Sequence, residues 1–135
     1  MSFFVRLTVF FYRLTGGKVG GRFRGSPVLL LTSTGRKSGK LRTTPVLFVH
    51  DGENLVVVAS NGGKDKDPSW WLNLKHNPTA QVEIRNEKRS VRAEKALGQD
   101  KNRLWLIVTK MYPSYEDYQR RTKREIPVVI LRPAE

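Results

Sequence analysis

The residues best suited to chemistry in this chain form a cationic connector, residues 32–45, between two apolar runs. It combines two glycines and several hydroxyl side chains with four basic residues, Arg36, Lys37, Lys40 and Arg42. Phosphate recognition uses fixed positive charge, hydroxyl donors and backbone N–H groups, and glycine lets the backbone approach an anion closely. The P-loop frame is missing. We therefore predict an anion-binding loop, with a solvated polar hairpin as the alternative.

Two further segments carry weaker signals. Residues 60–68 contain Gly62 and Gly63 before an expected helix, and helix N-termini attract anions. Trp70 and Trp71 follow and could stack on a planar ring, although paired aromatic residues on a short helix more often pack in the core, so we expect at least one there.

The third segment holds three of the four tyrosines of the chain, Tyr112, Tyr115 and Tyr118. Tyr115 and Tyr118 are three residues apart and share a helix face. Phenols stack on flat substrates and donate a proton or a hydrogen bond to developing negative charge. A half-buried helix with its hydroxyls in water is the alternative.

Other catalytic constellations are missing from the sequence. There is no cysteine, no G-x-S-x-G elbow and no H-E-x-x-H pair, and the two histidines, His50 and His76, stand far apart. We therefore expect no metal site, and an enzyme built from these side chains would need an organic cofactor.

The length and net charge of the chain limit its number of domains and the class of its partner. The chain has 135 residues, which fits one compact domain, and a net charge of +13. Residues 1–50 carry nine basic and no acidic residues. Such asymmetry predicts an anionic partner: nucleic acid, a membrane surface or an anionic small molecule.

The sequence pattern predicts both strands and helices to position these residues, and hence an α+β fold. Six short apolar or alternating runs, 27–32, 43–50, 54–60, 81–85, 88–96 and 126–131, suit an antiparallel sheet or barrel. Helices are expected over 69–77, with Asp67 as N-cap and Pro68 at the first position, over 99–112, and from Ser114 to about Arg124.

Residues 1–25 are expected to form an amphipathic helix and a flexible glycine-rich connector, with the barrel domain over 26–135. The apolar stripe consists of Phe3, Phe4, Leu7, Phe10, Phe11 and Leu14, while Arg6 and Arg13 lie off it. The stretch is too short to span a bilayer. It is interpreted as a helix that caps the core, or as a peripheral membrane contact through residues 3–14. The expected location is cytoplasmic, with the inner face of the cell membrane as the site of any such contact.

Four ordered motifs carry a family resemblance. They are Thr34-Gly35-Arg36-Lys37-Ser38-Gly39 with Arg42 and Pro45, Val58-Ala59-Ser60 with Gly62-Gly63, Pro68 with Trp70, Leu72-Asn73-Leu74 and Asn77-Pro78, and Met111-Tyr112-Pro113-Ser114-Tyr115 with Tyr118. Together with Ile126-Pro127, and over about residues 26–131, they resemble the deazaflavin-dependent nitroreductase family of actinobacteria.

The resemblance implies a split β-barrel that binds coenzyme F420, a deazaflavin with a phosphodiester and a polyglutamate tail. It implies hydride transfer from the reduced coenzyme to a planar conjugated acceptor, a quinone or a nitroaromatic. By the family pattern the phosphate and carboxylates are gripped by Arg36, Lys37, Ser38 and Arg42, and the ring is bordered by Pro45, Ala59, Ser60 and Gly62. Gly39, Gly63 and Trp70 are also expected at the cofactor. The catalytic residues implied are Ser60, Tyr112, Tyr115 and Tyr118.

Two departures from the family pattern concern the cofactor site. Leu47 stands in place of a tyrosine, and Asn61 replaces a lysine after the motif serine. Two alternatives stay open: a split-barrel reductase that binds flavin mononucleotide, and a nucleic-acid-binding barrel without catalysis. No strand carries the exposed aromatics that a stacking platform would need, so nucleic acid is not expected.

Overall fold

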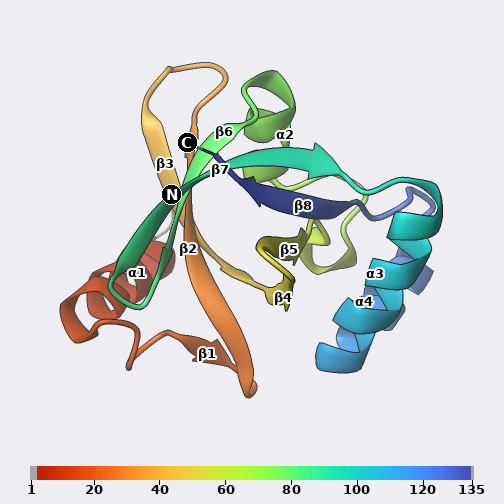
Figure 1. Cartoon of the computed structure of the whole chain (residues 1–135), viewed down its shortest axis with the longest axis horizontal. Helices are drawn as coiled ribbons and strands as arrows, with labels where there is room; N and C mark the ends of the chain where they lie inside the picture. Colours follow the sequence, from red (N-terminus) through yellow and green to blue (C-terminus); the bar gives the residue numbers. More distant parts are fainter. Residues whose placement is uncertain (1–2, 135) are drawn as a thin grey trace.

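A computed structural model describes residues 3–134 as a curled antiparallel sheet of eight strands with four α-helices around it (Figure 1). The strands are β1 (Arg22–Phe23), β2 (Ser26–Thr34), β3 (Leu41–Leu47), β4 (Val49–Asp51), β5 (Asn54–Val58), β6 (Thr79–Ile84), β7 (Glu87–Lys95) and β8 (Val128–Pro133). The helices are α1 (Phe3–Thr15), α2 (Ser69–His76), α3 (Gly98–Met111) and α4 (Ser114–Arg121), with a 3₁₀ turn η1 (Asn61–Gly63).

The strand order β1-β2-β6-β7-β8-β5-β4 places β2 and β5 far apart in the sheet, and residues 41–51 join them. β3 pairs with β2, and β4, which follows it directly, pairs with β5. The sheet is thereby closed into a split β-barrel, and the α+β class is confirmed.

The expected strands are present within a few residues, with two differences. The run 43–50, predicted as one strand, divides at Phe48, which is buried and whose backbone N–H donates to the carbonyl of Pro27 (3.2 Å). β1 was not predicted at all. It lies inside the glycine-rich connector and pairs with the start of β2, Arg22 opposite Pro27.

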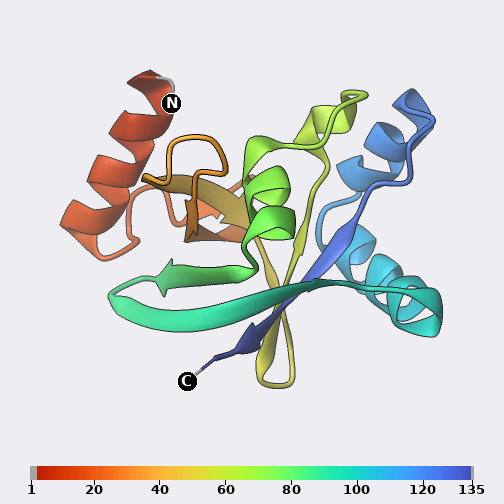
Figure 2. The ribbon, with the colours of Figure 1, turned by 90° about the horizontal axis from the view of Figure 1, so that it is seen from above.

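Both faces of the central strands are covered, which explains their continuous apolar sequences. Leu29 and Leu31 of β2 point into the barrel, whereas Leu30 packs outward against α1. On β5, Val57 likewise points inward and Val56 packs outward against α3 and α4. Figure 2 shows the result, with α1 at one end of the molecule, α3 and α4 at the other, and α2 between them.

Helix α1 meets the barrel through a different face from the predicted stripe. Val9 and Tyr12 are buried against Val28 and Leu30. Tyr12 Oη accepts a hydrogen bond from the Arg85 backbone N–H (2.8 Å) and lies 3.1 Å and 3.2 Å from the carbonyl oxygens of Val28 and Glu83. The helix therefore caps the barrel, as one of the two interpretations held.

The six stripe residues of α1 remain exposed. The most exposed are Phe3 (78%), Phe4 (76%), Leu14 (68%) and Phe10 (58%), and Leu7 and Phe11 are exposed to a smaller extent. Arg13, which lies off this stripe, forms an ion pair with Glu83 of the barrel, with 3.3 Å between Arg13 Nε and Glu83 Oε1. The helix thus buries a narrow face and presents its aromatic face outward.

Residues 16–21, at the start of the predicted connector, follow the barrel surface closely. The Gly17 N–H donates to the carbonyl of Tyr12 (2.8 Å), and the Val28 N–H donates to the carbonyl of Gly21 (2.9 Å). A Cβ on Gly17 would lie 3.2 Å from Arg85 Cα. The glycines permit this close approach and the turns with positive φ.

Helices α2 and α4 begin at Ser69 and Ser114, as predicted, but the N-cap of α2 and the end of α4 differ from prediction. Pro68, not Asp67, is the N-cap of α2, because the Asp67 carboxylate is engaged by Arg124 (3.0 Å). Pro113 precedes α4, and Ser114 is its first residue. α4 ends at Arg121, short of Arg124, since Thr122 is extended and its hydroxyl donates to Asp65 (2.9 Å).

Candidate active site

Two adjoining pockets lie between α1, α2, α4 and the open side of the barrel. The polar pocket encloses about 720 Å³ and is lined mainly by the β2–β3 loop, residues 61–67 and the start of α2. The aromatic pocket encloses about 630 Å³ and is lined by α1, β1, β3 and the tyrosines of 112–118. The two pockets adjoin, because both are bordered by Val5, Thr44, Asn61, Pro68 and Trp70.

The β2–β3 loop folds into a tight turn that gathers donors on the polar pocket. The Gly35 N–H donates to the carbonyl of Lys40 (2.7 Å), and the Gly39 N–H returns to the carbonyl of Gly35 (2.8 Å). Ser38 Oγ accepts from the Lys40 N–H (3.1 Å) and from Arg42 Nη2 (3.4 Å). A Cβ on Gly35 would lie 2.9 Å from Ser38 Oγ and 3.1 Å from the Lys40 carbonyl oxygen, so a larger residue would crowd this turn.

Asn73 of α2 anchors the loop to the barrel. Its Oδ1 accepts hydrogen bonds from the Arg36 backbone N–H (3.1 Å) and from Arg36 Nη1 (2.9 Å). Its Nδ2 donates to Ser33 Oγ of β2 (3.4 Å), and Asn73 itself is buried. Because the Asn73 amide is neutral, it orients Arg36 without adding a negative charge that would offset the guanidinium.

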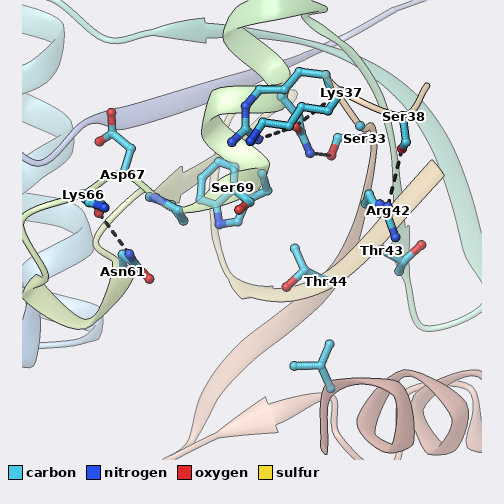
Figure 3. Close-up of a pocket in the computed structure, with 16 residues that line it drawn as sticks. Ser33, Lys37, Ser38, Arg42, Thr43, Thr44, Asn61, Lys66, Asp67 and Ser69 are labelled. Carbon is cyan, nitrogen blue, oxygen red and sulfur yellow. Dashed lines mark hydrogen bonds between the residues drawn. The ribbon is translucent and has the colours of Figure 1, made fainter. Parts of the chain in front are cut away.

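Figure 3 shows Ser38 and Arg42 on one side of the polar pocket and Asn61, Lys66 and Asp67 on the other. Four cations line the pocket: Arg36, Lys37, Arg42 and Lys66. Asp67, the carboxylate among the lining residues, is paired with Arg124 (3.0 Å) and Lys75 (3.5 Å). The pocket therefore presents excess positive charge, which is the chemistry that binds phosphate or carboxylate.

The segment after β5 separates the polar pocket from α4. Asn61 and Gly62 adopt positive φ (48° and 65°), and Asn61 Nδ2 donates to the carbonyl of Lys66 (3.0 Å). Gly63, with φ of 81°, is buried against the backbone of Tyr118. The segment is thereby shaped by its own backbone and by α4.

The three tyrosines cluster at the aromatic pocket. The rings of Tyr112 and Tyr115 are 4.9 Å apart edge to face, and the hydroxyls of Tyr112 and Tyr118 lie 3.3 Å apart. Burial raises the pKa of the Tyr115 phenol well above its ordinary value. The pKa of Tyr118 is also raised, mainly by its hydrogen bond with Tyr112 and to a smaller extent by burial. Both phenols consequently keep their protons at neutral pH.

The structure brings most of the predicted site residues together. Arg36, Lys37, Ser38 and Arg42 line the polar pocket, and Pro45, Leu47, Ser60, Gly62, Tyr112, Tyr115 and Tyr118 line the aromatic pocket, while Asn61 and Trp70 border both. Three predicted residues line neither. Ala59 is fully buried in the core, Gly63 is buried beneath Tyr118, and Gly39 lies in the turn of the β2–β3 loop.

Other lining residues were not predicted. Asn73 was present in a quoted motif, but its amide has no role that spacing alone reveals. Ser33 and Thr43 belong to the cationic connector, where they lie on the paired strands β2 and β3, and its hydroxyl side chains were noted in the sequence only as a group. Phe4 and Phe23 reach the aromatic pocket only through the packing of α1 and β1. Within residues 3–134, no three His, Asp or Glu side chains gather as metal ligands.

The comparisons with known proteins agree on one family. A family model described as F420H(2)-dependent quinone reductase matches residues 4–133. A protein of Mycobacterium tuberculosis named F420H(2)-dependent quinone reductase is 40% identical over 131 residues, 94% of this chain and 88% of that one. A solved F420-H2 dependent reductase is 39% identical with a TM-score of 0.72, covering 78% of this chain and 93% of that one.

A more distant structure shows the fold alone. It is a candidate pyridoxamine 5′-phosphate oxidase from Listeria innocua, 18% identical with a TM-score of 0.56 over 80% of this chain and 84% of that one. The split-barrel architecture is therefore shared beyond the relatives that use the deazaflavin.

Proposed function

Since this chain belongs to the F420H(2)-dependent quinone reductase family, we propose that its polar pocket holds the ionic tail of coenzyme F420 and its aromatic pocket the quinone. The protein is an F420-dependent oxidoreductase, and when bound the reduced coenzyme supplies the hydride that a quinone acceptor receives. Family membership favours this cofactor over the flavin mononucleotide alternative. The residue assignments below are our proposal.

The polar pocket fits an anionic tail. Arg36, Lys37 and Arg42 place three cations on one wall, and Ser38 Oγ lies within hydrogen-bonding distance of Arg42 Nη2. Lys66 adds a cation on the opposite wall, and the Asp67 charge is already compensated by Arg124. A phosphodiester and several carboxylates would thus meet donors and positive charge on two sides.

The planar ring would lie where the two pockets meet. Asn61 and Trp70 border both pockets, and Pro45, Ser60 and Gly62 line the aromatic side. Leu47, at one departure from the family pattern, adds apolar surface there. Gly39, Ala59 and Gly63 would act by shaping the backbone rather than by contact, because none of them lines a pocket.

The tyrosines would serve the acceptor. Reducing a quinone to a hydroquinone requires one hydride and one proton, so the site needs a proton donor as well as the coenzyme. The Oη of Tyr118 is a protonated phenol hydrogen-bonded to Tyr112, and Ser60 lines the same pocket. These groups would orient the acceptor carbonyl and donate to the oxygen on which charge develops. A nitroaromatic could use the same donors as an alternative acceptor.

The exposed face of α1 would provide a peripheral membrane contact. Its aromatic side chains point outward, Arg6 is also exposed, and Phe4 lines the aromatic pocket. A lipophilic acceptor could thus pass from the membrane interface directly to the site. The location would be the inner face of the cell membrane. None of the helices described over residues 3–134 has the length and apolarity to cross a bilayer.

One observation carries the proposal: a cationic pocket adjoins a cluster of three tyrosines. Titration with oxidised coenzyme F420, followed by its fluorescence, tests it against flavin mononucleotide and a single-stranded oligonucleotide. Micromolar binding of F420 is expected, with weaker binding of the other two. Preferential binding of flavin mononucleotide, or of the oligonucleotide with no binding of F420, would refute the assignment of the pockets.

A further inference from the structure

Arg124 lies outside both pockets but contacts the segment that borders both of them. Its Nη2 donates to the Ser60 carbonyl (2.8 Å), and its Nη1 donates to the Ala59 carbonyl (3.2 Å) and to Asp67 Oδ1 (3.0 Å). Its Nε donates to the Lys64 carbonyl (2.9 Å). One guanidinium thus joins four points of the segment 59–67, using four of the five N–H bonds that arginine has.

The guanidinium is itself held in place. Its side chain is only 16% exposed. The Arg124 carbonyl accepts from Gln119 Nε2 of α4 (2.8 Å), and the Ile126 N–H donates to Gln119 Oε1 (2.9 Å). Arg124 is thereby fixed to the helix that carries Tyr115 and Tyr118.

Together with the Gly63 N–H, which donates to the Ser60 carbonyl (2.9 Å), these hydrogen bonds set the orientation of two peptide groups next to the aromatic pocket. In a trans peptide the C=O and the following N–H point in opposite directions. Because the carbonyls of Ala59 and Ser60 point toward Arg124, the N–H groups of Ser60 and Asn61 point away from it. Ser60 and Asn61 both line the aromatic pocket.

We propose that Arg124 is a positioning residue, which fixes the wall shared by the two pockets and so sets the place of Ser60 relative to coenzyme and acceptor. This inference rests on the proposed function of the pockets. Arg124 acts through the segment and touches neither ligand.

Lysine cannot replace arginine in this role. The four acceptors lie around a planar fork, whereas an ammonium group has all its donors on one nitrogen. Arg124→Lys keeps the charge and the ion pair to Asp67 but cannot reach four separate acceptors. A role that depended only on charge would survive this substitution.

The test compares Arg124→Ala and Arg124→Lys with Lys123→Ala, which removes a positive charge from the exposed neighbour. Hydrogen exchange of amides 60–67 is measured by mass spectrometry in the coenzyme-free protein, together with the Kd for F420 and kcat with a soluble quinone. We expect faster exchange of this segment and a kcat lower by about 10–100-fold in both Arg124 variants. The Kd for F420 should change far less, because Arg36 and Arg42 stay in place.

Added guanidinium ion provides the decisive control. At millimolar concentration it should restore slow exchange and part of kcat in Arg124→Ala, and change nothing in Lys123→Ala. If Arg124→Ala does not fold, Arg124→Lys carries the test. Unchanged exchange and kcat in Arg124→Lys would overturn the inference. A wild-type protein that fails to reduce quinones would refute the proposed function, while the exchange data would still decide whether Arg124 holds the segment.

Discussion

Gly63 lies directly against the backbone of Tyr118. A Cβ added to Gly63 would be 2.9 Å from Tyr118 Cα and 3.0 Å from its carbonyl oxygen. The turn after β5 and the tyrosine helix α4 therefore touch main chain to main chain. The position of α4 and its tyrosines relative to residues 60–63 depends on this contact.

The first prediction follows from that contact. Gly63→Ala should destabilise the protein more than Gly52→Ala, although both glycines have positive φ, because a Cβ at Gly52 would meet nothing within 4 Å. Gly52→Ala should cost about 1 kcal/mol of the free energy of unfolding, the cost of left-handed backbone alone. Urea unfolding measures both. Equal losses would show that α4 can move away without cost.

The second prediction concerns the cationic wall. Arg42→Ala should weaken F420 binding about tenfold at low salt, since a charge-assisted hydrogen bond is lost. The loss should shrink as ionic strength rises. Lys40→Ala is the matched control, because Lys40 belongs to the same loop but does not line the polar pocket. Equal weakening in both variants would indicate that general charge, not the pocket, binds the coenzyme.

The loop that carries these cations shows how far the sequence can predict a site. The predicted anion-binding residues lie close together in the chain, so a single turn brings them to one place: Arg36, Lys37, Ser38 and Arg42. Phe23 reaches the pocket through β1, a two-residue strand that has no periodic signal and exists only because β2 pairs with it. Local clusters were therefore predictable, whereas contributions from distant elements were not.

Helix α1 shows a different limit. Periodicity identified its apolar residues correctly, but burial depends on which face meets a neighbour. Tyr12 is buried because its hydroxyl has backbone partners on β2 and beside the β6–β7 turn, and those partners appear only in the folded barrel. Phe3 and Phe10, although more apolar, lie on the other face.

The third prediction concerns the phenols. Tyr118→Phe and Tyr115→Phe should lower kcat with a quinone more than they weaken F420 binding, because the proposed function assigns the phenols to the acceptor. Tyr118→Phe should have the larger effect, since its hydroxyl lies 3.3 Å from that of Tyr112 and Tyr115 is almost fully buried. Steady-state kinetics and fluorescence titration separate the two quantities. Parallel losses would place the tyrosines at the coenzyme.

The fourth prediction concerns alkaline pH. The raised pKa of Tyr115 means that the folded state keeps a proton that the unfolded chain releases near pH 10. The unfolded state then binds fewer protons, so the free energy of unfolding falls as pH rises above about 10 and is unaffected below it. Tyr115→Phe should show a shallower decline in urea unfolding between pH 9 and 11. Parallel curves would contradict the burial of this phenol.

The fifth prediction tests the membrane contact. Serine at Phe3, Phe10 and Leu14 together should reduce sedimentation with anionic liposomes while leaving F420 binding unchanged, because none of the three lines a pocket. Leu106→Ser, which replaces a residue 70% exposed on α3, is the control for the loss of surface apolarity. Sedimentation unchanged in the triple variant would exclude α1 as the contact.

The neutrality of the Asn73 anchor has a kinetic consequence. A carboxylate in its place would hold Arg36 equally well but would cancel part of the field that the polar pocket projects into solvent. With an amide, the attraction reaches an approaching polyanion before contact, over about a Debye length, roughly 8–10 Å at moderate salt. At the proposed cofactor site, a neutral anchor would thus favour fast arrival of the coenzyme.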